Sequence, residues 1–210
     1  MSLNKDGVIV ILSSPSGAGK TTLVKKISST IDFTVSISYT TRIPRINEVN
    51  GKDYFFINRD QFNDLVRKDE LLEYANVFDN YYGSSKKKVF DLLKKGQNVI
   101  FDIDWQGAKQ IKDKNLNFKL ITFFILPPSK KTLKSRLAER ENNNQSVITE
   151  RMKKFDNDIK HWDEYDYVVI NDNLEICLNK ILEIIELNIK NEIVNFDKKK
   201  IEKHIEFLLK

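Results

Sequence analysis

The feature that most constrains the fold is a glycine-containing loop that separates a short apolar run from a helical pattern. The apolar run Val8–Leu12 is continuous and rich in β-branched residues, which is typical of a strand buried on both faces of a parallel sheet. Residues 13–19 interrupt it with serine, proline and glycine. A helix is expected from Lys20, because Leu23 and Ile27 then share one apolar face. This order predicts the beginning of an alternating α/β fold.

The loop nearly matches the phosphate-binding pattern G-x-x-x-x-G-K-[ST], with Ser14 in place of the first glycine. Glycines let backbone N–H groups surround an anion, and the helix N-terminus adds its positive dipole end. We expect Lys20 to reach the phosphates of a nucleoside triphosphate and the Thr21 hydroxyl to ligate Mg²⁺. A chance glycine-rich turn is the alternative. The residues predicted to bind the triphosphate are Ser14, Pro15, Ser16, Gly17, Ala18, Gly19, Lys20, Thr21 and Thr22.

Further apolar runs and helical stretches alternate along the chain, which predicts right-handed crossovers and a parallel sheet flanked by helices. The runs are Val99–Phe101, Leu120–Leu126 and Tyr167–Ile170, and helical periodicity occupies about 86–95, 106–112 and 130–139. Asp102 follows the first of these runs and is placed like the acidic residue that holds Mg²⁺ through water in such folds. A turn residue at the end of a strand is the alternative for Asp102.

Three regions depart from this alternation. Residues 38–85 hold five of the seven tyrosines and a helical stretch near Asp60–Arg67, which predicts a small mixed α/β insert. Residues 129–160 are highly charged and predict two helices joined by a polar tip at 142–145. The tail 195–210 has apolar residues at helical spacing, which either cap the core or join a partner chain.

Composition restricts the class of function. The 35 Lys and Arg against 30 Asp and Glu give a net charge of +5, which suits an anionic ligand but does not require nucleic acid. The single cysteine, Cys177, excludes an internal disulfide and a cysteine-based zinc site. The apolar runs are too short to span a membrane, and the N-terminus lacks a signal-peptide pattern. We therefore expect a cytoplasmic protein without nucleic-acid or membrane partners, monomeric or homo-oligomeric.

The insert carries groups suited to a second, phosphorylated ligand. Arg42 and Arg45 flank Pro44, so two guanidinium groups on a semi-rigid backbone can hold one phosphate. Solvated surface arginines are the alternative. Hydroxyl and carboxylate groups can complement the N–H edge and carbonyl of guanine, although the residues alone leave the base open. These polar residues are Ser38, Tyr54, Tyr82, Glu73, Ser84, Asp102 and Asp104.

These motifs resemble those of the guanylate kinase family, and the resemblance runs from about Val8 to Ile185. The segment 40–54 is similar to the family's GMP-site motif and is highly specific, because it combines Thr-Thr-Arg-x-Pro-Arg with a later Glu, Gly and Asp-Tyr. The other similar blocks are residues 13–21, 80–84, 102–107, 126–129 and 169–172. Their number and order make coincidence negligible.

The resemblance implies reversible ATP-dependent phosphorylation of GMP, and of dGMP with it, to the diphosphate by in-line transfer with Mg²⁺. It implies a core P-loop domain of 1–37, 86–128 and 161–210, a GMP-binding insert of 38–85 and a lid of 129–160. The implied catalytic residues are Lys20, Arg45, Arg136, Arg140 and Arg151, and Asn171 is implied near the adenine. The implied GMP-binding residues are Ser38, Arg42, Arg45, Glu48, Tyr54, Glu73, Tyr82, Ser84, Asp102 and Asp104. Thr21 is the implied metal ligand, with Asp102 acting through water.

The sequence departs from the family pattern at two places. Asn47 stands where the family usually has glycine, and Glu139-Arg140-Glu141 replaces Gly-Arg-Gly in the lid. The second change places negative charge beside a phosphate-binding arginine and is expected to slow closure. The alternative function is a non-catalytic guanylate-kinase-like binding module. Lys20 and Thr21 favour the enzyme, because such modules usually have a degraded phosphate loop. A kinase for another acceptor and nucleic-acid binding through lysine runs are less favoured.

Overall fold

The computed structural model describes residues 6–141 and 143–210, and the chain divides into two compact units. One unit comprises the described residues up to Ile11 together with Ile31–Leu120, and the other comprises Leu12–Thr30 and Ile121–Lys210. The division falls within strand β1 (Ile9–Ser13), which contributes to both units. The division into core, insert and lid expected from the sequence is a different partition and stays a prediction.

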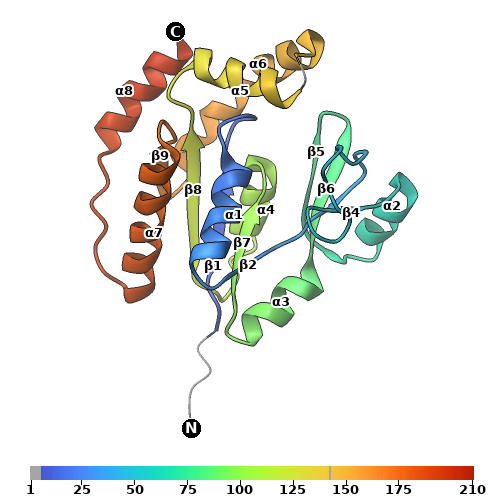
Figure 1. Ribbon diagram of the computed structural model, residues 1–210. Helices are drawn as coiled ribbons and strands as arrows, with labels where there is room; N and C mark the ends of the chain where they lie inside the picture. The colour runs from blue at the N-terminus through green and yellow to red at the C-terminus, as the bar shows by residue number, and fades with distance from the viewer. Residues whose placement is uncertain (1–5, 142) are drawn as a thin grey trace. The chain divides into compact units, whose positions relative to one another are not determined.

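The first unit contains most of the strands and three of the helices (Figure 1). Its strands are β2 (Phe33–Val35), β3 (Tyr39–Thr40), β4 (Phe55–Phe56), β5 (Leu71–Val77), β6 (Asn80–Ser85) and β7 (Asn98–Asp102). Its helices are α2 (Arg59–Arg67), α3 (Lys86–Lys94) and α4 (Trp105–Asp113).

The second unit is mostly helical around two strands. Its strands are β8 (Leu120–Leu126) and β9 (Tyr167–Ile170). Its helices are α1 (Lys20–Thr30), α5 (Lys130–Arg140), α6 (Gln145–Asp158), the 3₁₀ helix η1 (Ile159–Glu164), α7 (Leu174–Lys190) and α8 (Lys198–Leu209). The predicted pair of helices at 129–160 is therefore confirmed as α5 and α6. Residue 142, in the predicted polar tip, lies outside the described residues.

A five-stranded sheet has the order β2-β7-β1-β8-β9, and the pairs β2/β7 and β8/β9 are parallel. The four runs that the sequence marked as buried strands are β1, β7, β8 and β9, so the predicted parallel α/β architecture is confirmed. The sequence analysis missed β2. This strand has only three residues at a sheet edge, of which only Phe33 is buried, so it carries no apolar run to recognise.

The insert region forms a second sheet of order β4-β3-β6-β5. Strands β5 and β6 form an antiparallel hairpin, and its two-residue turn has positive φ at Phe78 and Asp79, which matches the twist of the paired strands. Helix α2 begins with a capping box in which Asn58 and Gln61 satisfy each other's backbone N–H groups. The strands and helix expected in this region are therefore present.

Helix α4 covers the free edge of β5. The side-chain amide of Gln110 accepts from the Tyr74 N–H at 3.1 Å and donates to the Tyr74 carbonyl at 2.6 Å, as a neighbouring strand would. Gln106 donates from its side chain to the Asn76 carbonyl at 3.3 Å. These bonds satisfy backbone groups that an edge strand would otherwise expose, and they fix α4 against β5.

In the second unit, β8 is buried from Ile121 to Leu126, while α7 packs on α1 and β9. Helix α8 buries Ile201, Ile205 and Leu208, and a ring nitrogen of His204 lies 2.9 Å from the Pro127 carbonyl oxygen. The C-terminal tail therefore covers its own unit, which agrees with the first of the two roles considered for it.

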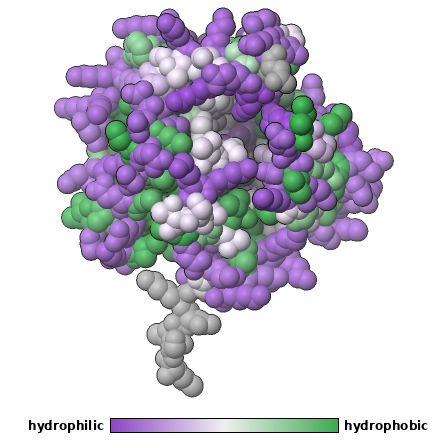
Figure 2. All heavy atoms as spheres, in the orientation of Figure 1, coloured by the Kyte–Doolittle hydropathy of each residue, from purple (hydrophilic) through white to green (hydrophobic). Residues whose placement is uncertain are grey.

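The exterior is dominated by hydrophilic residues on the face that Figure 2 shows, as expected for a chain with 31% charged residues. Cys177 is a buried core residue, 3% exposed, and burial raises the pKa of its thiol to about 12. Among the described residues, no helix combines the length and apolar character needed to cross a membrane.

The buried Thr122 of β8 provides a test of the fold. Its hydroxyl donates to an Asp166 carboxylate oxygen at 2.8 Å and accepts from the Asp166 N–H at 3.0 Å. Thr122→Val keeps the shape but leaves the Asp166 N–H without this acceptor, while the Asp166 carboxylate loses the hydroxyl donor and keeps the backbone N–H of residue 122 at 2.9 Å. We expect the free energy of unfolding in urea to fall by about 1–3 kcal/mol at an unchanged m-value. Thr30→Val, at an exposed helix end, is the control, and an equal loss in both variants would contradict the role of Thr122.

Candidate active site

The phosphate loop has the backbone that an anion cradle requires. Gly17 and Gly19 adopt positive φ values of 92° and 96°, which other L residues rarely adopt. The loop leads directly into α1, whose first residue is Lys20, so the helix N-terminus and the Lys20 and Thr21 positions adjoin the cradle. Gly17 also packs against Leu133 and Leu137 of α5, where a Cβ would lie 3.0–3.1 Å from their side chains.

Asn171, at the end of β9, holds the loop from inside the unit. Its side-chain amide donates to the Ala18 carbonyl at 2.8 Å, and the residue is 3% exposed. A Cβ at Gly19 would overlap this amide, so glycine is required there for space as well as for its φ. The family resemblance implies only a place near the adenine for Asn171, and this contact has no local sequence signal because the two residues lie 153 positions apart.

The three arginines of the predicted lid contact the phosphate loop or Asn171, which bonds to that loop. Arg140 and Arg151 both donate to the Ser16 hydroxyl, at 2.8 and 2.7 Å, from helices more than 120 residues away in sequence. Arg136 donates to the Asn171 carbonyl at 3.1 Å. Three positive groups of the predicted site therefore lie beside the loop that is expected to hold phosphates.

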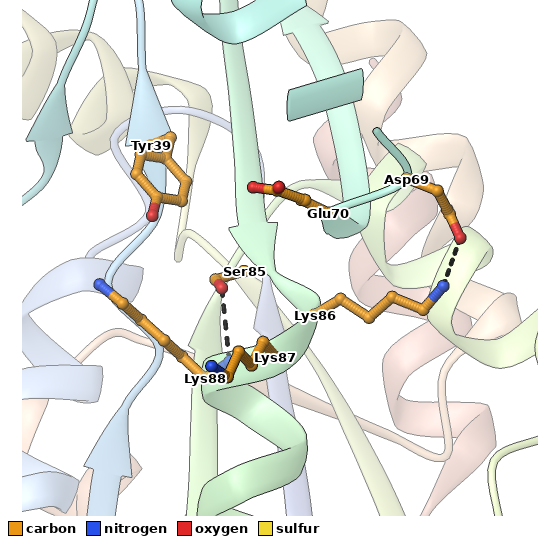
Figure 3. Close-up of a pocket in the computed structure, with 7 residues that line it drawn as sticks. All are labelled: Tyr39, Asp69, Glu70, Ser85, Lys86, Lys87 and Lys88. Atoms are coloured by element: carbon orange, nitrogen blue, oxygen red, sulfur yellow. Dashed lines mark hydrogen bonds and ion pairs between the residues drawn. The ribbon is translucent and has the colours of Figure 1, made fainter. Parts of the chain in front are cut away.

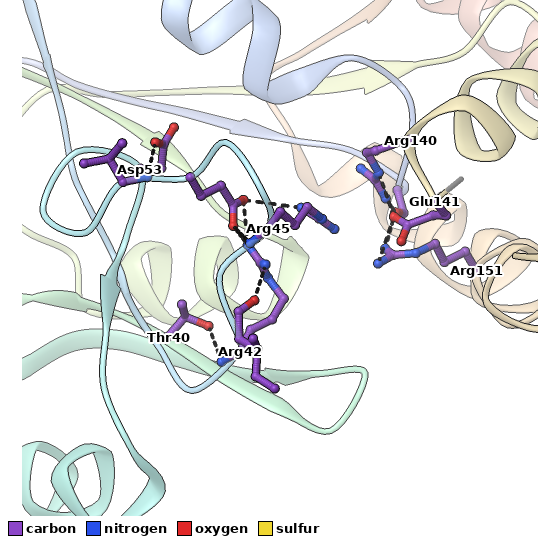
Figure 4. A network of polar contacts seen from close by, with 11 residues as sticks. Thr40, Arg42, Arg45, Asp53, Arg140, Glu141 and Arg151 are labelled. Carbon is purple, nitrogen blue, oxygen red and sulfur yellow. Dashed lines mark hydrogen bonds and ion pairs between the residues drawn. The ribbon is translucent and has the colours of Figure 1, made fainter. Parts of the chain in front are cut away.

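Glu141 lies between two of these arginines, and Figure 4 shows the three side chains directed toward one another. One carboxylate oxygen of Glu141 accepts from Arg140 Nε at 2.9 Å and lies 3.3 Å from an Arg151 guanidinium nitrogen. Glu139, the other acidic neighbour of Arg140, is exposed. Of the two acidic departures from the family pattern, Glu141 is therefore the one that contacts the arginines.

In the first unit, Glu48 bonds to the two arginines of the insert, Arg42 and Arg45, which are labelled in Figure 4. Arg42 donates to both Glu48 carboxylate oxygens, at 2.8 and 2.9 Å, and the Arg45 backbone N–H donates to the same carboxylate at 2.8 Å. Burial opposes ionisation of Glu48, but these hydrogen bonds outweigh it and lower its pKa. The carboxylate therefore stays charged at neutral pH and fixes both arginines on one loop.

Aromatic rings and a carboxylate surround Arg42. Its guanidinium lies 5.4 Å from the Tyr54 ring centroid, and Tyr54 meets Tyr82 edge-on with centroids 5.9 Å apart. Burial, and next the nearby charge of Asp102, raise the pKa of the Tyr54 hydroxyl. Tyr54 therefore remains a hydrogen-bond donor at physiological pH, as a phosphate-binding hydroxyl must.

A buried polar chain links three of the residues predicted to bind GMP. Ser84 Oγ donates to Glu73 Oε1 at 2.6 Å and lies 3.4 Å from Ser38 Oγ. All three side chains are buried, with Glu73 only 3% exposed. A carboxylate and a hydroxyl side by side can accept from the N–H groups of a base and donate to its carbonyl oxygen.

Asp104 has a role that the sequence analysis did not anticipate. Its Oδ1 accepts from the N–H groups of Gln106 and Gly107 at 3.0 and 3.2 Å, which caps α4, and its Oδ2 accepts from the Gln106 side chain at 2.9 Å. The signal was available, because Asp before a helical run is a common N-cap. Contact of Asp104 with the base stays a prediction.

A surface pocket of about 490 Å³ lies elsewhere in the first unit (Figure 3). Its lining residues are Tyr39, Asp69, Glu70, Ser85, Lys86, Lys87 and Lys88. None of these is a predicted GMP-binding residue, and acidic and basic groups offset each other, with Lys86 paired to Asp69 at 2.5 Å. The arginine and carboxylate clusters therefore define the candidate site better than this pocket does.

Comparison with known proteins gives a consistent result. The family model for guanylate kinase matches residues 7–188. A curated guanylate kinase of Rickettsia felis is 47% identical over 187 residues, 88% of this chain and 96% of that protein. One of Rickettsia prowazekii is 49% identical over 187 residues, 88% of this chain and 93% of that protein. The crystal structure of guanylate kinase from Anaplasma phagocytophilum has a TM-score of 0.74 and 34% identity, covering 88% of this chain and 87% of that one. A family match over most of its length and relatives at this level of identity show that this chain belongs to the guanylate kinase family.

Proposed function

We propose that this protein transfers the γ-phosphoryl group of ATP to GMP, giving ADP and GDP. The observation that carries the proposal is the convergence of Arg140 and Arg151 on Ser16 of the phosphate loop. Positive charge gathered at a phosphate cradle suits a reaction whose transition state spreads negative charge over phosphoryl oxygens. A module that only binds peptides has no need for this arrangement.

On the triphosphate side, the chain's task is positioning and charge stabilisation. The loop backbone would hold phosphate oxygens, and Lys20 would reach the β- and γ-phosphates. Arg136, Arg140 and Arg151 would cover the transferring group. Asn171 would act mainly through the loop, because its amide bonds to the Ala18 carbonyl. No general base is needed, since the attacking phosphate of GMP is already anionic.

On the acceptor side, Arg42 and Arg45 would grip the GMP phosphate, with Tyr54 and Tyr82 as hydroxyl donors. Glu48 keeps the arginines in place but also occupies Arg42, so Arg42 reaches the phosphate with its remaining donors. The buried Ser38, Ser84 and Glu73 would read guanine. Their burial favours a base edge over a solvated phosphate.

The residues present fit a magnesium ion that binds together with ATP. Among the described residues, no group of three or more His, Cys, Asp or Glu side chains is arranged to hold a metal. The Thr21 hydroxyl is an exposed, hard oxygen donor of the kind Mg²⁺ prefers, and Asp102 offers a carboxylate for contact through water. When bound, the ion neutralises phosphate charge. A cytoplasmic role in purine nucleotide metabolism follows as part of the proposal.

The acceptor identity is tested by ADP release with ATP and Mg²⁺ in the presence of GMP, AMP, CMP or UMP separately. We expect turnover with GMP far above that with the other nucleotides, because Glu73 and Ser84 complement the guanine edge. Turnover with another acceptor would keep the phosphate loop but overturn the role of these two residues. Binding of ATP and GMP without any turnover would favour the non-catalytic module.

Arg140→Ala separates transition-state charge stabilisation from acceptor binding. We expect kcat to fall by about a hundredfold, because one charged donor aimed at the reacting group is lost. The KM for GMP should change little, since the insert arginines are untouched. Steady-state kinetics would measure both, with Arg67→Ala on the exposed face of α2 as the control. Equal losses in kcat and GMP affinity would contradict the role assigned to Arg140.

Glu141→Gln tests whether the acidic lid residue competes with ATP phosphates. The substitution keeps the shape but removes the charge that Arg140 and Arg151 now share. We expect the KM for ATP to fall by up to about fivefold, the worth of a partly exposed ion pair. This fall in the KM for ATP should be smaller at high salt. Glu139→Gln is the matched control, and a higher KM for ATP in Glu141→Gln would indicate that Glu141 instead pre-organises the arginines.

A further inference from the structure

Gly107 lies in the first turn of α4, against the buried carboxylate of Glu73 on β5. A Cβ built at position 107 would overlap Glu73 Oε2 and lie 3.1 Å from Glu73 Cδ. It would also approach the side chain of Ile103 at 3.4 Å. Only a residue without a side chain therefore leaves the Glu73 carboxylate in its present position.

The backbone on either side of this contact is fixed. Asp104 caps the first turn of α4 and accepts from the Gly107 N–H itself at 3.2 Å. Gln110 pairs with both backbone groups of Tyr74, next to Glu73 in β5. Gln106 on the other side of Gly107 donates to the Asn76 carbonyl of β5, so side chains flanking Gly107 hold the helix against the strand. A side chain at 107 would be accommodated by moving the free end of Glu73 rather than the backbone.

Backbone conformation does not explain the glycine. Gly107 lies within a regular helix, unlike Gly17 and Gly19, whose φ values are positive. Glycine is less favourable than alanine inside a helix, so this position gives up helix stability. The space needed by the Glu73 carboxylate explains why glycine is present despite this loss of helix stability.

We propose that Gly107 is a positioning residue for guanine recognition, because it leaves room for Glu73 to remain bonded to Ser84. The inference rests on the proposed function, in which Glu73 and Ser84 read the base. With a Cβ at position 107, the Glu73 carboxylate swings away from Ser84 Oγ, which now donates to it at 2.6 Å. The Glu73 carboxylate and the Ser84 hydroxyl then no longer lie side by side as an acceptor and a donor for the same base.

The experiment compares Gly107→Ala with the wild type and with Lys109→Ala, an exposed position on the same helix. Calorimetry measures the Kd for GMP, and kinetics measure KM for GMP and for ATP. In Gly107→Ala we expect Kd and KM for GMP to rise at least about tenfold, as for the loss of a buried charged hydrogen bond. The KM for ATP should not rise, and the Tm should not fall. Lys109→Ala should match the wild type throughout.

A second substitution distinguishes positioning from general damage. Glu73→Asp shortens the side chain by one methylene, which draws the carboxylate back from a Cβ at position 107. In the Gly107→Ala background it should restore part of the GMP affinity. The fold-loss of GMP affinity in the double variant should therefore be smaller than the product of the fold-losses in the two single variants. Wild-type GMP affinity in Gly107→Ala, or losses that multiply in the double variant, would overturn the proposal. If Gly107→Ala alone does not fold, the double variant should fold, and failure of both would also overturn it.

The wild-type measurements separate this inference from the function it rests on. Tight GMP binding without turnover would refute the proposed reaction, while the Kd comparison would still decide the role of Gly107. Absence of GMP binding by the wild type would overturn both.

Discussion

The hydrogen bond from the Asn171 side chain to the Ala18 carbonyl is the constraint on which the proposed triphosphate site depends. A phosphate loop works only if its N–H groups point inward, and glycines alone permit that conformation without enforcing it. The buried amide of Asn171 joins the loop to the end of β9 and excludes any side chain at Gly19. Arg136 bonds to the backbone of the same residue. Loop, strand end and first lid arginine are thus held by one residue.

The two arginine clusters of the molecule follow the same physical rule. Guanidinium groups crowded together without a ligand repel one another, and a carboxylate relieves that repulsion. Glu48 serves Arg42 and Arg45, and Glu141 serves Arg140 and Arg151. Each carboxylate also competes with a bound phosphate, because it occupies guanidinium donors that the phosphate would use. Glu48 belongs to the family's motif, whereas Glu141 replaces a usual glycine. This chain therefore places a carboxylate between arginines at a second position.

The proposed guanine site depends on a contact between two elements as well as on the residues proposed to bind the base. Glu73 and Ser84 come from the paired strands β5 and β6, which explains why they lie together. On its other side the Glu73 carboxylate faces Gly107 of α4, whose N–H is capped by Asp104. Asp104 and Gly107 therefore form a supporting turn, and their spacing of three residues is that of an N-cap and the third helical residue.

The parallel α/β architecture, the phosphate loop and the family could all be predicted from the amino-acid sequence. These depend on continuous apolar runs and on short motifs whose chemistry is local. It did not reveal β2, because three edge residues carry no periodic signal. The contact partners of the site residues depend on the folded chain. Asn171 bonds to the loop, Glu141 contacts two arginines, and Gly107 makes room for Glu73. Apart from the contact of Glu141 with its neighbour Arg140, these contacts join residues from 10 to more than 150 positions apart. Packing determines such contacts, and no local sequence pattern indicates them.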